Sequence, residues 1–241
     1  MTSRELLLMA VPATVALAGG VLAALWHPTH RARGLIQHFA AGVVLAALAV
    51  ELLPEIEREH APALVLAGAF AAGAVFMFLL KLLTERLESR PGRRTGVDTG
   101  LMLAVFIDVA IDGFIIGAGF AAGGETGPVL AVGLSVELLF LGLALTSDAP
   151  GGWRIVGLSA ALGATVLSAA VVGTLVLGGA SHAVIGGALA FAAAALLYLV
   201  TEELLMEAHQ GDEPETPWAT LVLFAGFLAF WSVQLVGQGP G

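Results

Sequence analysis

Residues 101–122 read LMLAVFIDVAIDGFIIGAGFAA, an apolar run long enough to cross the roughly 30 Å hydrocarbon core of a membrane as a helix. Asp108 and Asp112 interrupt the run, and their spacing of four residues places both on one face of that helix. An ionised acid at the bilayer centre costs roughly 2.5–3.5 kcal/mol on insertion scales. Such acids persist where they are protonated, face water or bind a cation, so the stretch predicts a membrane helix with a functional face.

A third carboxylate, Glu137, lies midway along the next apolar run, PVLAVGLSVELLFLGLAL, residues 128–145. Neither run contains a Lys or Arg that would neutralise its acids. Three such acids represent a burden of about 8–10 kcal/mol, which a purely structural role does not explain. We therefore expect Asp108, Asp112 and Glu137 to carry the function.

Composition places the chain among integral membrane proteins. Of its 241 residues, 58% are hydrophobic and 12% are charged, about half the charge density of a soluble domain. The absence of Cys excludes disulfides, thiolate metal sites and cysteine nucleophiles. A net charge of −9 argues against nucleic acid as a partner and favours a cationic cargo, although acidic loops alone could produce it.

Apolar runs of membrane-spanning length predict an all-α bundle of about eight transmembrane helices in the lipid bilayer. The expected spans are 5–26, 35–55, 62–83, 99–122, 127–147, 154–178, 182–207 and 218–236. We expect residues 1–241 to form a single transmembrane domain, with a loop at 84–98 between the third and fourth helices. The spacings Gly113/Gly117 and Gly119/Gly123 predict surfaces where helices pack closely.

Loop charges predict the orientation. The links after the first and third spans are basic, and the links after the second and fourth are mainly acidic. The basic residues concerned are Arg31, Arg33, Arg86, Arg90, Arg93 and Arg94. Placing them in the cytoplasm gives a multi-pass cell-membrane protein with a cytoplasmic 84–98 loop and both termini outside.

A short pattern occurs twice. The second span contains ELLPE at 51–55 and the seventh contains ELLME at 203–207, each after a Gly/Ala-rich apolar run. The two spans are expected to run in opposite directions, and a pattern repeated with opposite polarity is typical of the inverted repeats of secondary transporters. The match is short, so coincidence is the alternative interpretation.

The repeat suggests a route for a cation. It places Glu51 and Glu55 at the outer end of the second span, and Glu203 and Glu207 at the inner end of the seventh. His38 and His209 would lie near the same inner end, where imidazole and carboxylate together suit Zn-, Fe- or Mn-type ions. The central acids would lie between these groups. The alternative is that acids and histidines at helix ends are simply solvated at the interface.

With these features, the sequence resembles the ZIP (Zrt-/Irt-like) family of divalent metal transporters. The resemblance covers most of the chain and rests on three segments. They are GLIQHFAAGVVLAALAVELLPE at 34–55, IDVAIDGFIIGAG at 107–119 and ALAFAAAALLYLVTEELLMEAH at 188–209, similar to the family's second, fourth and seventh helices.

The fourth helix shows both matches and departures. The family usually has His-Asn-x-x-Asp-Gly-x-x-x-Gly there, and Asp112, Gly113 and Gly117 match that pattern. Asp108 stands where the family has His, and Val109 stands where it has Asn. In place of an imidazole, this chain therefore has another carboxylate.

The fifth helix departs further, because the family shows His-x-x-Pro-Glu there. An alignment on Gly142 puts Glu137 at the His position and Leu141 at the acid position. A shift by one helical turn puts Glu137 at the acid position, with Val136 in place of Pro. Both registers remain open.

The resemblance implies uptake of divalent metal ions toward the cytoplasm by alternating access, in a ZIP-like fold with an inverted repeat. It also implies a homodimer and no cofactor, since the ion is the cargo. Zn, Mn, Fe, Cd and Mg are the candidate ions. A site made only of carboxylates favours harder ions such as Mg, Mn or Ca over Zn.

Functions other than metal transport fit some of the same residues. The same acids could relay protons in a carrier of another solute, or a ZIP-like chain without transport could act as a sensor or scaffold. An enzyme is not expected. Asp108 and Asp112 share one helix, whereas an aspartate dyad normally joins two, and Ser135 and Ser159 have no His at comparable depth.

Overall fold

The computed structural model describes residues 2–25, 29–88, 99–144, 152–204 and 218–237, and these form helices without any strand. The α-helices are α1 (Ser3–Leu25), α2 (His30–Ala47), α3 (Leu53–Arg58), α4 (Ala63–Glu88), α5 (Thr99–Ala122), α6 (Thr126–Ala144), α7 (Gly152–Leu177), α8 (His182–Leu199) and α10 (Trp218–Gly237). Two π-helical turns, η1 (Leu48–Leu52) and η3 (Val200–Leu204), follow α2 and α8 directly. The predicted all-α fold is confirmed.

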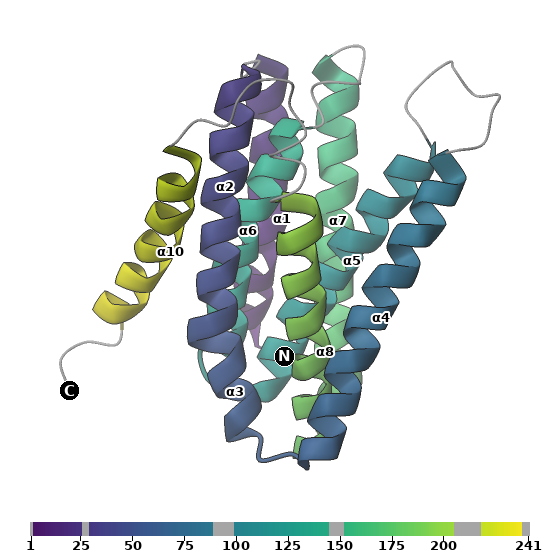
Figure 1. Ribbon diagram of the computed structural model, residues 1–241, viewed down its shortest axis with the longest axis vertical. Coiled ribbons are helices and arrows are strands. Elements are labelled where there is room, and N and C mark those ends of the chain that lie inside the picture. Colours follow the sequence, from purple (N-terminus) through teal and green to yellow (C-terminus); the bar gives the residue numbers. More distant parts are fainter. Residues whose placement is uncertain (1, 26–28, 89–98, 145–151, 205–217, 238–241) are drawn as a thin grey trace.

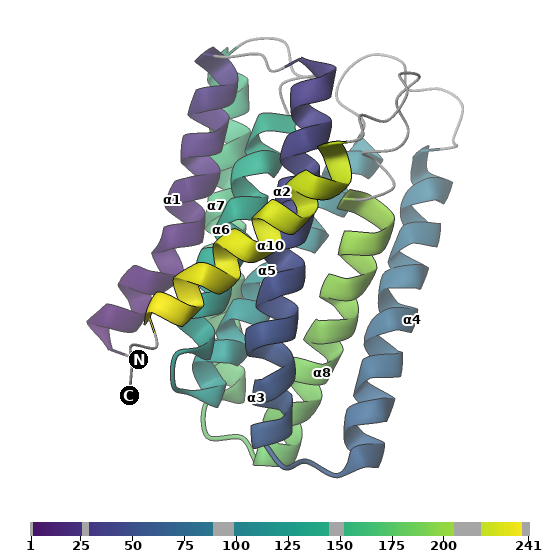
Figure 2. The same ribbon diagram turned by 60° about the vertical axis from the view of Figure 1, so that its left-hand side comes forward.

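Most helices stand side by side in a bundle, and α10 lies obliquely against α2 (Figures 1 and 2). Seven of the described helices are long and apolar enough to cross a membrane. The qualifying apolar stretch of α6, Thr126–Gly142, is shorter, and this helix packs against α1, α2 and α5 within the bundle. The described helices thus fit a multi-pass membrane protein.

The outer surface of the bundle is apolar. On α4 the exposed side chains include Phe70, Phe76 and Phe78, whereas α8 buries most of its Ala-rich face against its neighbours. An apolar surface this extensive is unfavourable in water but matches the lipid tails of a bilayer. Burial therefore agrees with the membrane interpretation from composition.

The observed helices extend beyond several expected spans. After α2, the helix continues through η1 and α3 to Arg58, and α4 continues to Glu88. The segment TERLE at 84–88 consists largely of good helix formers, which explains why α4 outlasts its apolar run. Residues 89–98, the remainder of the expected loop, lie outside the described part.

The two ends of the described chain lie at the same end of the bundle. The start of α1 and the end of α10 are found there, together with the α3–α4, α5–α6 and α7–α8 links (Figures 1 and 2). This is the arrangement of a chain that traverses the bundle an even number of times.

Small residues bring α5 against α7. A Cβ added at Gly113 or Gly117 would lie closer than 3.0 Å to the backbone of α7, at Val166 and Ala170 respectively. The packing role predicted for this pair is confirmed. Gly119 packs against Gly127 at the start of α6. The packing role predicted for Gly123 is wrong, because this residue has φ +92° and a Cβ added to it would meet nothing within 4 Å. Gly123 belongs to the turn after α5.

The two π-helical turns coincide with the repeated sequence pattern. Glu51 is the fourth residue of η1 and Glu203 is the fourth residue of η3. The α2–η1 and α8–η3 helices run in opposite directions (Figure 1). A π-helical turn is rare in proteins and often marks a functional position.

Candidate metal centre

The centre is built on α5, which contacts α4, α6, α7 and α8. Asp108 and Asp112 follow each other by one helical turn on a single face of α5. Asp112 is 1% exposed and Asp108 is half-buried. The close approach of α7 at Gly113 fixes α5 immediately beside Asp112.

Glu137 reaches the same level from α6 because α5 and α6 form a hairpin. Gly123 and Gly124 adopt φ values of +92° and +61° in the turn, a left-handed backbone that favours glycine. Asp112 lies ten residues before the end of α5, and Glu137 lies eleven residues after the start of α6. At 1.5 Å per residue, both are about 15 Å from the turn.

The three carboxylates converge. One oxygen each from Asp108, Asp112 and Glu137 lies within 4.8 Å of the others. Two full charges at that separation repel by roughly 3.5 kcal/mol at an effective dielectric constant of about 20. A bound cation or bound protons would remove this repulsion, and Asp112 and Glu137 are buried where few other ions reach them.

The spacing suits one hard cation. Oxygens on opposite sides of a single ion are separated by about 4.2 Å around Mg²⁺ and about 4.6–5.2 Å around Ca²⁺. Within the described part of the chain, this is the only group of three or more acids and histidines close enough to share an ion. All its donors are carboxylate oxygens, the ligand type preferred by Mg, Mn and Ca.

The structure does not bring His38 into this group. His38 is 7% exposed, and its Nδ1 donates a hydrogen bond to the Gly34 carbonyl oxygen, 2.8 Å away within α2. The side chain of Glu203, together with Glu207 and His209, falls outside the described part. The exit site predicted from these residues therefore stays a prediction.

Glu51 has a different environment from the three converging acids. It is 9% exposed, its Oε1 accepts a hydrogen bond from the Thr126 hydroxyl at 2.9 Å, and its Oε2 accepts one from the Gln234 amide at 3.0 Å. These donors belong to α6 and α10. Glu51 thus ties η1 to two other helices, a connection that its helix-end position did not reveal.

Two further acids, one on α3 and one directly after it, also have partners. Glu55 forms an ion pair with Arg58 at 2.9 Å. Glu59, which was not among the expected ligands, contacts His182 of α8 at 2.8 Å and is buried. The predicted role of Glu51 and Glu55 as an entrance is not tested by these contacts, but each carboxylate already has a protein partner.

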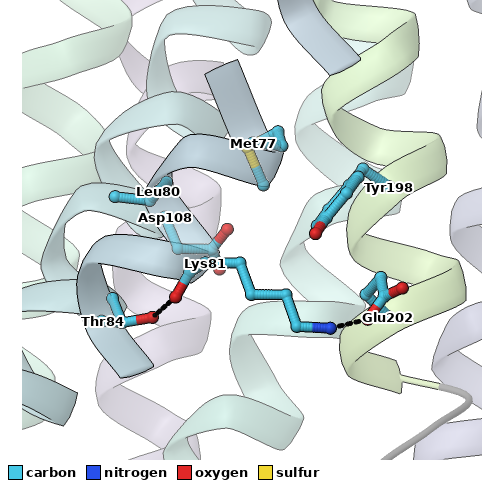
Figure 3. A pocket seen from close by; sticks show the side chains of 7 residues that line it. All are labelled: Met77, Leu80, Lys81, Thr84, Asp108, Tyr198 and Glu202. Atoms are coloured by element: carbon cyan, nitrogen blue, oxygen red, sulfur yellow. Dashed lines mark hydrogen bonds and ion pairs between the residues drawn. The ribbon is translucent and has the colours of Figure 1, made fainter. Parts of the chain in front are cut away.

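A cavity of about 100 Å³ lies beside the centre (Figure 3). Its polar lining comprises Lys81, Thr84, Asp108, Tyr198 and Glu202. The Lys81 ammonium donates to the Glu202 carboxylate, joining α4 to η3. Lys81 was not singled out from the sequence, although it is the one charged residue in the expected span 62–83. That isolation was the signal that could have found it.

Comparison of the chain with protein-family models finds no match, and comparison with curated proteins finds none either.

Proposed function

We propose that the protein is a membrane transporter of divalent metal cations, in which Asp108, Asp112 and Glu137 hold the ion midway through the bundle. One observation carries the proposal: carboxylates from two helices converge within 4.8 Å at the centre of an apolar helix bundle. Acids at membrane depth commonly mark ion pathways, and a single dication would offset their mutual repulsion. The ZIP-like resemblance of the sequence points in the same direction.

The donor set favours a hard ion. Three carboxylates without imidazole suit Mg²⁺, Mn²⁺ or Ca²⁺ better than Zn²⁺, because hard oxygen ligands discriminate against softer ions. The imidazole of His38, which belongs to the predicted route, is not part of this group. We therefore expect this site to bind Mn²⁺ or Mg²⁺ more tightly, compared with Zn²⁺ or Cd²⁺, than the usual affinity order of divalent ions predicts.

The ion would be carried by relative movement of the two halves of an inverted repeat with eight membrane crossings. The aligned π-helical turns η1 and η3 support such a repeat, since they occur at the same position of the same pattern on oppositely directed helices. Repeats of this kind rock against each other and expose a central site alternately to each side. Basic links would lie in the cytoplasm and both termini outside, and the resemblance to the ZIP family implies inward transport.

Metal binding to the purified protein tests the proposal directly. Titration of wild type and Asp108→Ala in detergent with Mn²⁺, Fe²⁺, Zn²⁺, Cd²⁺, Mg²⁺ and Ca²⁺ should show saturable binding of hard ions that the variant loses. Glu125→Ala removes an exposed carboxylate from the α5–α6 link and serves as the matched control. Absence of binding by any ion in wild type would contradict metal transport and favour the proton-coupled alternative.

Uptake into proteoliposomes completes the test. Wild type and Glu125→Ala should accumulate the ion that binds, whereas Asp108→Ala and Glu137→Ala should not. Equal uptake by all four proteins, at equal amounts of inserted protein, would contradict the assignment of the central site.

A further inference from the structure

Lys81 is the one charged residue of the candidate membrane span Ala63–Thr84 in α4. It lies three residues from the end of that span, and its partner Glu202 is the last residue of the candidate span His182–Glu202. Its side chain is 36% exposed, and that of its partner Glu202 is 31% exposed, so both groups face a partly open space. Ionisable residues within transmembrane segments commonly pair with one another and mark ion or proton pathways.

The space that the pair faces connects with the acid centre. Asp108 lines the same cavity as Lys81 and Glu202, and Asp108 is also one of the three converging carboxylates. Figure 3 shows Asp108 beside Lys81 on one side of the cavity, with Tyr198 and Glu202 facing them from α8 and η3. A volume of about 100 Å³ is enough for several water molecules.

The pair lies toward the end of the bundle where α4 ends and α5 begins. Lys81 is seven residues from the end of α4, and Glu202 lies in η3, after α8. Asp108 is farther along α5, nine residues from its start. An ion that leaves the centre toward that end through this cavity must therefore pass the Lys81–Glu202 pair.

We propose that the Lys81 ammonium blocks the exit from the centre by pairing with the Glu202 carboxylate. To leave, the transported ion must displace Lys81 from Glu202. This inference rests on the proposed transport function. The ammonium repels an approaching dication, and its pairing removes from the pathway the carboxylate that would otherwise receive the ion. Once Lys81 moves away, Glu202 becomes the next oxygen ligand after Asp108. Lys81 and the cargo thus compete for one carboxylate.

Cysteine accessibility tests the gate without requiring transport. The chain contains no Cys, so Met77→Cys introduces a single thiol on the cavity wall, one turn from Lys81. Labelling by a positively charged thiosulfonate reagent should be slow when Lys81 is present. With Lys81→Met added, we expect labelling to be about tenfold faster, the rate factor for a barrier lowered by about 1.4 kcal/mol.

Two variants control for loss of charge and for damage to the fold. Lys81→Arg keeps the cation and should retain slow labelling. The exchange of Lys81→Glu with Glu202→Lys restores an ion pair of reversed polarity and should return labelling toward the slow rate. Equal labelling rates in Lys81→Met and wild type would overturn the gate, as would fast labelling in Lys81→Arg.

Metal binding and flux in the same preparations separate this inference from the function on which it rests. If the gate is correct, Lys81→Met binds the ion at the centre with nearly wild-type affinity and releases it about tenfold faster. Wild-type flux in Lys81→Met, with binding intact, would overturn the gate and leave metal transport standing. Failure of wild type to bind or move any of the six ions would overturn both.

Discussion

Two buried carboxylate sites in this bundle are arranged in opposite ways. At the centre, Asp108, Asp112 and Glu137 place oxygens within 4.8 Å of one another. At the other site, one oxygen of Glu51 accepts a hydrogen bond from the Thr126 hydroxyl and the other accepts one from the Gln234 amide. Both sites lie within a helix bundle with an apolar surface, yet three acids converge at the first, whereas Glu51 accepts from two neutral donors at the second.

The difference in surroundings distinguishes a site that we propose to bind a cation from a carboxylate that connects helices. Neutral donors satisfy the Glu51 oxygens without any ion, so Glu51 can join three helices permanently. Converging acids repel one another until a cation or protons arrive, so their environment changes with occupancy. This comparison supports the proposal that the centre binds the cation, and it shows that Glu51 links η1 to α6 and α10. The entrance role predicted for Glu51 stays a prediction.

The largest expected effect comes from removing one charge at the centre. Asp112→Asn keeps the shape of the side chain but replaces a carboxylate oxygen by an amide nitrogen, which cannot ligate a cation in the same way. We expect affinity for the bound ion to fall at least about 100-fold, equivalent to about 2.7 kcal/mol. Isothermal titration of the purified protein measures this loss.

Thermal unfolding of the same variant sharpens the contrast. Without metal, Asp112→Asn should unfold at a higher temperature than wild type, because one source of repulsion is gone. With metal, only wild type should gain stability, since an ion that binds the folded state alone stabilises it. A metal-dependent gain of equal size in the Asn variant would show that the ion binds elsewhere.

The next effect tests position rather than charge. A Cβ at Gly113 would collide with the Val166 carbonyl and with Ala169 on α7, so Gly113→Ala should push α5 away while leaving all three acids in place. We expect about a tenfold loss of metal affinity, together with about 1–3 kcal/mol of destabilisation from overpacking.

Gly157→Ala on α7 is the matched control, because a Cβ there meets nothing within 4 Å. Alanine is the better helix former by about 1 kcal/mol, so this variant should be slightly more stable than wild type and should bind metal normally. Equal affinity in the two variants would mean that the centre tolerates displacement of α5.

Much of the centre could be predicted from the sequence, for reasons that are local. The spacing of Asp108 and Asp112 fixes their common face whatever the tertiary structure. The position of Glu137 follows from a short Gly-Gly turn that leaves it as far from the turn as Asp112. Helix identity likewise follows from apolar runs, although α4 extends past its run because TERLE continues the helix.

The contacts that the sequence could not predict join residues far apart in the chain. Lys81 and Glu202 are 121 residues apart, and Glu51 and Gln234 are 183 residues apart. Such pairs depend on which helices become neighbours and on their rotation, and periodicity does not determine either. The π-helical turns also depend on tertiary packing, although the pattern that carries them was visible twice.

A smaller effect is expected at the second site. Glu51→Gln keeps one carbonyl oxygen but turns an amide nitrogen toward either the Thr126 hydroxyl or the Gln234 amide. A poorly paired buried donor costs about 1–3 kcal/mol, so stability should fall while metal affinity at the centre remains close to wild type. A loss of affinity comparable to that of Asp112→Asn would return Glu51 to the cation route.

Thr126→Val tests the smallest piece of the comparison, one hydrogen bond to Glu51. Valine has nearly the same shape, so the change deletes the 2.9 Å bond to Oε1 and leaves the Gln234 bond to Oε2. We expect about 1 kcal/mol of destabilisation, the usual contribution of one hydrogen bond, and unchanged uptake. Thr165→Val is the control, since that hydroxyl donates to the Ala161 carbonyl of its own helix. If both variants lose the same stability, the bond to Glu51 contributes no more than a hydroxyl on a helix surface. If Thr126→Val loses more while transporting normally, the bond from Thr126 to Glu51 stabilises the junction of η1, α6 and α10 and is not needed for transport.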